Sequence, residues 1–150
     1  MAPGEFHLNH ATEPADILAC LPLLRELRPH LGSDSAVLAQ IQRQAQQGYR
    51  LLALWRGGEA VACAGYRISE NLVRGRFLYV DDLVATARER SRGHGERLLN
   101  ALFAEARDRD CHWLVLDSGV TNVGAHRFYL RHRLEITAFH FAAPLGLEEP

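Results

Sequence analysis

The sequence predicts a single α/β domain, in the wider sense that includes α+β order, over residues 1–150. Two observations predict this class. Stretches with apolar residues at helical spacing are mixed along the chain with shorter stretches of the β-branched and aromatic residues typical of strands. A glycine-rich turn at residues 90–95 also joins a strand-like stretch to a helix-like one. A chain of 150 residues can bury a sizeable core, and we find no linker, repeat or low-complexity tract in it.

The first half of the chain is expected to form an edge strand, two helices and then a meander of three strands. Pro22 lies inside the first helical pattern, and Ser33 or Asp34 is expected to cap the second helix. Gly57 and Gly58 permit the positive φ of a tight hairpin between the first two meander strands. The expected strands cover residues 6–9, 49–55, 60–68 and 77–85, and the expected helices cover 16–28 and 33 or 34 to 47.

The second half is expected to form two further helices and two further strands. Leu98 and Leu102 lie on the apolar face of an amphipathic helix that follows the turn. The short apolar strand after it would be buried if it were central in a sheet, and Pro144 would end the last strand. The expected helices cover residues 96–109 and 122–131, and the expected strands cover 113–116 and 136–142.

Composition excludes several classes of partner. Hydrophobic residues make up 47% and charged residues 23% of the chain, and the net charge of −1 carries no polybasic signature for nucleic acid. No apolar run approaches the length of a membrane span, so no membrane partner is expected. Cys20, Cys63 and Cys111 are far apart and odd in number, which favours a reducing compartment. Together with an N-terminus that does not resemble a secretory signal, this predicts a cytoplasmic protein.

Residues 90–95, Arg-Ser-Arg-Gly-His-Gly, are the stretch with the clearest chemical meaning. The first backbone N–H groups of a helix have no partner inside it, and the positive end of the helix dipole favours an anion. Gly93 and Gly95 lack a Cβ, so backbone and ligand can approach closely. Arg90 and Arg92 could pair with a diphosphate, whereas His94 is expected to contribute mainly its backbone N–H. The stretch therefore predicts a phosphate-binding turn.

Other motifs fit this sequence less well. A P-loop needs Gly-Lys-Ser/Thr, which is missing, and there is no Gly-x-Ser-x-Gly elbow. A dinucleotide site would use Gly93, Gly95 and Asp117, but Leu98 replaces its third glycine and too few elements follow. The histidines show no metal-ligand spacing, so all except His94 are interpreted as scattered surface residues and no metal site is expected. The histidines of the chain are His7, His10, His30, His94, His112, His126, His132 and His140.

Two motifs resemble those of the GNAT acyltransferase superfamily. The first is R-x-x-G-x-G, from Arg90 to Gly95, which begins eight residues after Asp82. The second is N-x-x-A-x-x-F-Y, from Asn122 to Tyr129. The resemblance implies a mixed central sheet of six to seven strands with about four helices. It also implies a GNAT-type N-acetyltransferase that moves an acetyl group from acetyl-CoA directly to a primary amine.

The resemblance also implies roles for individual residues. A backbone N–H near the bulged centre of the strand at 77–85, at Leu83 or Val84, would polarise the thioester, and this strand through Ala85 would pair with the pantetheine arm. The turn would bind the phosphates through Arg90, Ser91, Arg92, Gly93, His94 and Gly95. Asn122 would cap its helix or reach the pantetheine amide, with Ala125 beside the cofactor. Tyr129 would protonate the departing thiolate, or else it would only pack its ring.

The general base is left open by the sequence. Asp81 and Asp82 are adjacent on a strand, so their side chains are expected to point to opposite faces and only one of them to face the cleft. Asp81 is the preferred catalytic candidate, because a carboxylate near the apolar cofactor arm would have a raised pKa. The alternative is that both are strand-end charges, one of them satisfied by Arg25, Arg76 or a backbone donor. Glu70 is a further candidate.

The sequence departs from the family pattern after Tyr129. Arg133 and Leu134 stand where the family commonly has Gly-Phe, so Arg133 must accept strain or end the helix differently. The acceptor could be a polyamine, an amino acid, an antibiotic or a protein amine, and a homodimer is compatible with the sequence. The alternatives to an enzyme of this class are a CoA-binding module without transfer activity and a nucleotide-binding oxidoreductase.

Overall fold

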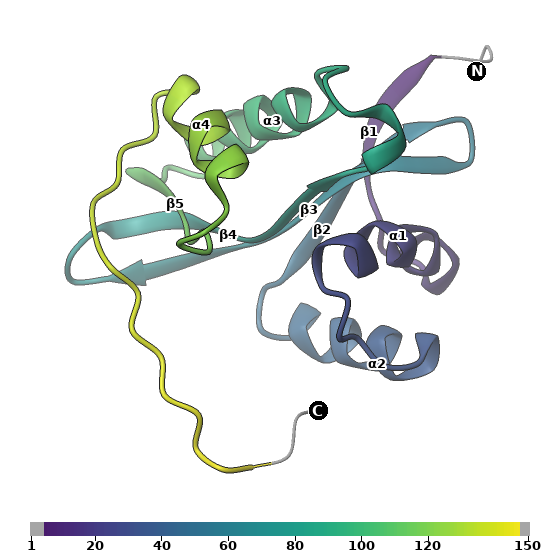
Figure 1. Cartoon of the computed structure of the whole chain (residues 1–150), viewed down its shortest axis with the longest axis horizontal. Helices are drawn as coiled ribbons and strands as arrows, with labels where there is room; N and C mark the ends of the chain where they lie inside the picture. Colours follow the sequence, from purple (N-terminus) through teal and green to yellow (C-terminus); the bar gives the residue numbers. More distant parts are fainter. Residues whose placement is uncertain (1–4, 148–150) are drawn as a thin grey trace. The chain divides into compact units, whose positions relative to one another are not determined.

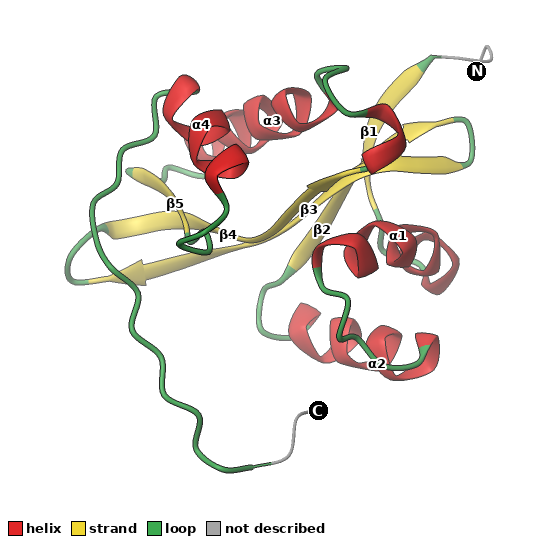
Figure 2. Cartoon of the chain, in the orientation of Figure 1, coloured by secondary structure: helices red, strands yellow, loops and turns green. Residues whose placement is uncertain are grey.

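Five strands form one mixed sheet in the computed structural model, which describes residues 5–147 (Figures 1 and 2). The strand order is β1-β2-β3-β4-β5, antiparallel from β1 to β4 and parallel between β4 and β5. A mixed sheet is thus confirmed, while the expected count of six to seven strands is wrong. The strands are β1 (Phe6–His10), β2 (Arg50–Arg56), β3 (Glu59–Asn71), β4 (Gly75–Ala85) and β5 (Trp113–Leu116).

The described chain divides into two compact units, the first ending at Leu116 and the second beginning at Asp117. The first unit holds the whole sheet, three α-helices and a short 3₁₀ helix, η1. The second unit holds α4 and the segment that follows it. The four α-helices confirm the expected number, and they are α1 (Pro14–Leu27), α2 (Asp34–Ala45), α3 (His94–Asp108) and α4 (Val123–Arg131), with η1 at Ala87–Glu89.

Helices cover both faces of the sheet in the first unit (Figure 1). One apolar cluster joins α1 and α2 to one face through Leu21, Leu24 and Ile41. The other joins α3 to the opposite face through Leu98 and Leu102. Burial on two faces explains why β2 and the first half of β3 are almost wholly apolar instead of alternating.

Local signals in the sequence correspond to the observed boundaries. Ser33 caps α2, since its hydroxyl accepts a hydrogen bond from the Ala36 N–H at 3.2 Å. Gly57, with φ of 60°, forms the β2–β3 hairpin turn, and Gly48, with φ of 92°, follows α2. Pro22 lies inside α1, as its pattern indicated, and Pro14 occupies the first turn of this helix. The short strand at 113–116 is an edge strand and not a central one.

The expected last strand, residues 136–142, is absent from the structure. In the described part of the chain, residues 135–147 belong to no helix or strand. Strand pairing needs a partner as well as a suitable sequence, and no strand within residues 5–147 pairs with this segment. This missing strand accounts for the smaller sheet.

Candidate active site

The C-terminal half of β4 has one free edge in the described structure. Pairing between β4 and β5 ends at Val80 and Leu116, whereas pairing with β3 continues to Ala85. Residues 81–85 therefore have a strand neighbour on one side only. The predicted cofactor-binding residues Leu83, Val84 and Ala85 are half-buried here. Backbone groups along such an edge can pair with an extended ligand as a strand would.

A β-bulge distorts β4 at the start of this edge. Val80 pairs with Tyr66 and Asp82 pairs with Gly65, so Asp81 is the extra residue. The bulge was expected nearest Leu83 and Val84, and the structure places it two residues earlier. Gly65 is required opposite it, because a Cβ at this position would overlap the Tyr49 hydroxyl.

Asp81 and Asp82 both bind arginine side chains around the bulge. Asp81 accepts a hydrogen bond from Arg67 Nε at 2.9 Å, and Asp82 accepts one from Arg28 Nε at 3.3 Å. Tyr49 donates its hydroxyl to Asp82 at 2.8 Å, and the Arg67 guanidinium lies over the Tyr49 ring at 5.5 Å. Both carboxylates thus lie on the Tyr49 side of the sheet. The expectation that they point to opposite faces is wrong because of the inserted residue.

The arginines that bind Asp81 and Asp82 are not the ones that the sequence suggested. Arg25 pairs with Asp34, and Arg76 donates to the Arg109 carbonyl, so neither neutralises the acidic pair. Partial burial raises the pKa of Asp81 above its ordinary value, while the hydrogen bond and charge of Arg67 oppose that shift. A raised pKa brings this carboxylate closer to the range in which a general base operates.

Glu70 lies too far along the sheet to share this site. It is opposite Arg76, nine residues before Ala85 on β4. At about 3.3 Å per strand residue, that is roughly 30 Å of strand. The candidate base Asp81 is only four residues from Ala85.

The predicted phosphate-binding turn follows β4 and η1 and begins α3. Ser91 and Gly93 have positive φ, 67° and 80°, and the intervening Arg92 does not. Such alternation turns successive N–H groups toward a common side and forms an anion-binding concavity. In the part of the chain that the structure describes, the backbone N–H groups of residues 90–95 donate to no protein acceptor. Arg90 is exposed, as are Ser91 and Arg92.

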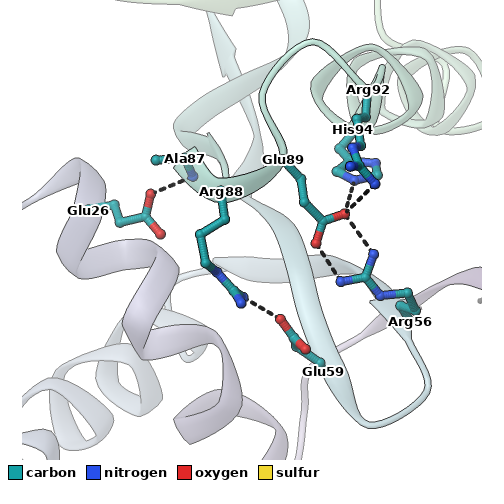
Figure 3. Close-up of polar contacts among 8 residues, drawn as sticks. All are labelled: Glu26, Arg56, Glu59, Ala87, Arg88, Glu89, Arg92 and His94. Atoms are coloured by element: carbon teal, nitrogen blue, oxygen red, sulfur yellow. Dashed lines mark hydrogen bonds and ion pairs between the residues drawn. The ribbon is translucent and has the colours of Figure 1, made fainter.

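A buried ion-pair cluster supports the turn from inside the first unit (Figure 3). Glu89 is only 8% exposed and accepts two hydrogen bonds from the Arg56 guanidinium, one of them at 2.7 Å. The His94 ring nitrogen Nε2 lies 3.1 Å from the same carboxylate, and Arg92 lies 3.9 Å from it. The hydrogen bonds from Arg56 and His94 hold the pKa of Glu89 at about 2. We call Arg56, Glu89 and His94 the turn cluster.

Two further contacts fix the turn from other elements. The Phe6 ring lies 5.2 Å from the His94 ring. Figure 3 shows the second contact, in which the Ala87 N–H donates to Glu26 of α1 at 2.9 Å. The His94 side chain is only 4% exposed and is therefore buried. Its side chain has a supporting role in addition to the expected backbone N–H.

Sequence reasoning missed Glu89 and Arg56 altogether. Arg56 is 33 positions from Glu89 and ends the second strand, so no local spacing connects them. Only the unusual burial of a carboxylate reveals the pair, since buried acidic residues are rarely found without partners.

The second unit presents the other predicted motif on α4. The Asn122 side chain accepts a hydrogen bond from the Ala125 N–H at 3.2 Å, so it caps this helix. Tyr129 lies seven residues after Asn122, about two turns further on nearly the same helix face. Arg133 follows α4 with φ of 70°, and the Leu134 N–H reaches back to the Tyr129 carbonyl at 3.0 Å. The helix thus ends as it would with glycine, and Arg133 bears the strain.

Residues 5–147 contain neither a cluster of metal-ligating side chains nor a membrane-spanning helix. No group of three histidine, cysteine or acidic side chains there could hold a metal ion. None of the described helices is long and apolar enough to cross a bilayer. The antiparallel pairing of β1 to β4 also differs from the parallel sheet of a dinucleotide fold, which removes the oxidoreductase alternative.

Comparison with known proteins identifies the family. The model of the acetyltransferase (GNAT) family matches residues 17–133. The chain belongs to this family. An uncharacterised N-acetyltransferase of Bacillus subtilis, YhdJ, is 29% identical over 123 residues, which cover 82% of this chain and 87% of that protein. As a GNAT member, the chain is an N-acetyltransferase that uses acetyl-CoA, and the expected enzyme class is confirmed.

Solved structures share the fold. An acetyltransferase of Trypanosoma brucei has a TM-score of 0.78 and 22% identity, covering 94% of this chain and all of that one. The aminoglycoside N-acetyltransferase AAC(6')-Iy in complex with CoA has a TM-score of 0.80 and 17% identity, covering 98% of this chain and 100% of that one. Both likenesses confirm the predicted fold class.

Proposed function

We propose that acetyl-CoA binds along the free edge of β4 and the turn at 90–95, and that its acetyl group passes to a primary amine. The observation that carries this assignment is the run of unpaired N–H groups at the turn, which follows η1 and the free edge of β4. Those donors suit the diphosphate, and the edge at Leu83, Val84 and Ala85 suits the amides of the pantetheine arm. The CoA bound to the structural relative AAC(6')-Iy supports the same ligand class.

Charge at the turn suits an anionic ligand. Arg90 and Arg92 are exposed there, and Arg92 is only loosely held at 3.9 Å from Glu89. Two carboxylates lie nearby: Glu89, which Arg56 already neutralises, and Glu96 in the first turn of α3. The turn therefore presents net positive charge to a phosphate group.

Transfer requires a neutral amine, a polarised carbonyl and a proton for the thiolate. The amine nitrogen attacks the thioester carbon, the C–S bond breaks, and the carbon–nitrogen bond of the amide forms. In our proposal, a backbone N–H at Leu83 or Val84 polarises the carbonyl, and Asp81 takes the ammonium proton directly or through water. Tyr129 gives its proton to the sulfur, while Asn122 and Ala125 line the cofactor.

We infer that the chain acts as one domain in the cytoplasm. The family match runs through both structural units, from residue 17 to residue 133. All three cysteines are free thiols, which suits a reducing compartment. The acceptor is a small-molecule or protein amine, and no nucleic acid is needed.

The test is a thiol-release assay with acetyl-CoA and a panel of polyamines, amino acids, aminoglycosides and peptides with free N-termini. We expect CoA release that depends on both acetyl-CoA and one amine class. Release of CoA at the same rate with and without every amine would contradict transfer to an amine. Isothermal calorimetry with CoA checks the cofactor site independently of any acceptor.

A further inference from the structure

In the part of the chain that the structure describes, the charged side chains around the β-bulge leave one acceptor and one donor without a partner. Asp82 has both carboxylate oxygens occupied, Oδ2 by the Tyr49 hydroxyl at 2.8 Å and Oδ1 by Arg28. Asp81 accepts from Arg67 through Oδ2, and its Oδ1 accepts no hydrogen bond from any described residue. Arg28 donates through Nε and Nη2, and its Nη1 has no acceptor among the same residues. One carboxylate oxygen and one guanidinium nitrogen are therefore available to a ligand.

These two atoms belong to groups that meet at the bulge. Arg28 Nη2 donates to the backbone carbonyl of Asp81 at 2.9 Å, so the guanidinium lies against the residue that supplies the available oxygen. The Arg28 side chain is 44% exposed and the Asp81 side chain is 25% exposed, so a ligand can reach both from solvent. Asp81 also begins the free edge of β4, along which we place the pantetheine arm. A ligand at this position is therefore placed to accept the acetyl group.

Positive and negative charges are balanced around Asp81. Besides partial burial, the groups that act on the pKa of Asp81 are Arg67, Asp82 and Arg28. Two carboxylates and two guanidiniums give no net charge, so a polycation such as a polyamine or an aminoglycoside gains no general attraction here. The two arginines would also repel its additional ammonium groups. A ligand with one positive and one negative group close together matches the available oxygen and the available nitrogen.

We propose that the acceptor is a free α-amino acid, whose ammonium group binds Asp81 and whose carboxylate binds Arg28. This inference rests on the proposed acetyl transfer and adds the class of amine. In an α-amino acid the two charged groups are separated by a single carbon, which suits a guanidinium that lies against Asp81 itself. Asp81 takes a proton from the ammonium group, the nitrogen bonds to the acetyl carbon, and the C–S bond of the thioester breaks. The products are an N-acetyl amino acid, the CoA thiol and one proton released to solvent.

The first experiment compares each amino acid with its own amide, which keeps the amine and removes the carboxylate. Thiol release from acetyl-CoA is measured with the wild-type protein on a panel of such pairs, together with polyamines and aminoglycosides. We expect kcat/KM for the best amino acid to exceed that for its amide at least about tenfold, because hydrogen bonds between charged groups are the stronger kind.

Two results would overturn the inference, and they differ in what they say about acetyl transfer. If an amino acid amide, a polyamine or an aminoglycoside is acetylated as well as the best amino acid, the acceptor class is wrong and transfer to an amine stands. If CoA binds in calorimetry but no amine in the panel is acetylated, the proposed function fails and this inference fails with it.

The second experiment tests Arg28 by substitution. Arg28→Gln should lower kcat/KM for the amino acid at least about tenfold more than for its amide, mainly through a higher KM, because the carboxylate loses its charged partner. Arg25→Gln is the matched control, since Arg25 lies in the last turn of the same helix and pairs with Asp34 instead. This variant should keep the wild-type preference. Equal losses for acid and amide in folded Arg28→Gln would show that Arg28 only holds the bulge in place.

Discussion

Gly93 combines the two properties that the proposed phosphate site needs from a single residue. Its φ of 80° lies in the left-handed region, and a Cβ built on it would meet no atom within 4 Å. Backbone conformation, not lack of space in the protein, therefore restricts this position to glycine. The space beside it is free for a ligand oxygen.

Gly93→Val is expected to weaken CoA binding at least about tenfold, which corresponds to about 1.4 kcal/mol. A β-branched residue in this conformation costs roughly 1–3 kcal/mol, so the turn would rearrange and its N–H groups would separate. Calorimetric titration with CoA measures the change. Gly58→Val is the control, because Gly58 has equal space and no positive φ. Equal CoA affinity in folded Gly93→Val and wild type would disprove the role of this turn.

Substitution of Tyr129 distinguishes a role in catalysis from a role in cofactor binding. Tyr129→Phe keeps the ring and removes the acidic proton, so we expect kcat to fall by ~10²–10⁴ with the Kd for CoA nearly unchanged. Steady-state kinetics with an identified amine and calorimetry with CoA give the two values. Tyr66→Phe is the control, because that phenol pairs with His10 at 2.8 Å within the sheet. An unaltered kcat when chemistry limits turnover would leave Tyr129 a packing residue.

At the scale of elements, the turn between η1 and α3 depends on the turn cluster. Glu89 receives donors from β2 and from the first residue of α3, so one carboxylate ties the turn to the sheet and to the helix. Each of these hydrogen bonds favours its ionised form. The conformation of the turn should thus depend on the charge of Glu89.

The pH dependence of this contribution has a definite sign. The pKa of Glu89 is lowered from 4.5 to about 2 in the folded chain, so its stabilisation is fully present above about pH 4.5 and is lost as pH falls toward 2. We expect Tm to decline more steeply over this window in wild type than in Glu89→Gln. Glu59→Gln, which removes an exposed pair with Arg88, is the control and should retain the wild-type slope. Parallel Tm curves for wild type and Glu89→Gln would contradict the assignment.

Elements set by local chemistry were predicted well from the sequence. The Ser33 cap, the Gly57 hairpin and the Asn122 cap each depend on residues within a few positions, and all are confirmed. The family was identified from two short motifs of the same local kind, and the family match confirms it. The residue roles within those motifs stay predictions.

Features that depend on distant partners were not predicted. The bulge at Asp81 arises from pairing with Gly65, and the turn cluster joins residues 33 positions apart. The prediction of a strand at 136–142 was wrong for the same reason. The sequence pattern specifies a strand, but it does not specify a neighbouring strand with which to pair. Sequence periodicity describes an element, whereas register and burial belong to pairs of elements.

At the scale of the whole molecule, a chain that works as a single domain should show an effect of cofactor binding on hydrogen exchange in both structural units. Our proposal assigns the turn and the strand edge to the cofactor, and it also assigns Asn122, Ala125 and Tyr129 to it. Hydrogen exchange reports local opening at each amide, so it can test whether binding reaches both. Binding at 100 times Kd would add about 2.7 kcal/mol of stability.

We therefore expect acetyl-CoA to slow exchange at residues 81–85, at the turn at 90–95 and along α4 together. The adenosine 3′,5′-diphosphate fragment, which carries phosphates but no pantetheine arm, is the matched control ligand. This fragment should slow exchange at the turn and leave exchange at residues 81–85 and along α4 at the rates of the free protein. The reason is that only the pantetheine arm can occupy a strand edge or reach Tyr129. Exchange along α4 that is unchanged by acetyl-CoA, while the turn is protected, would show that the second unit takes no part in binding the cofactor. The acid would then have to come from water or from the first unit.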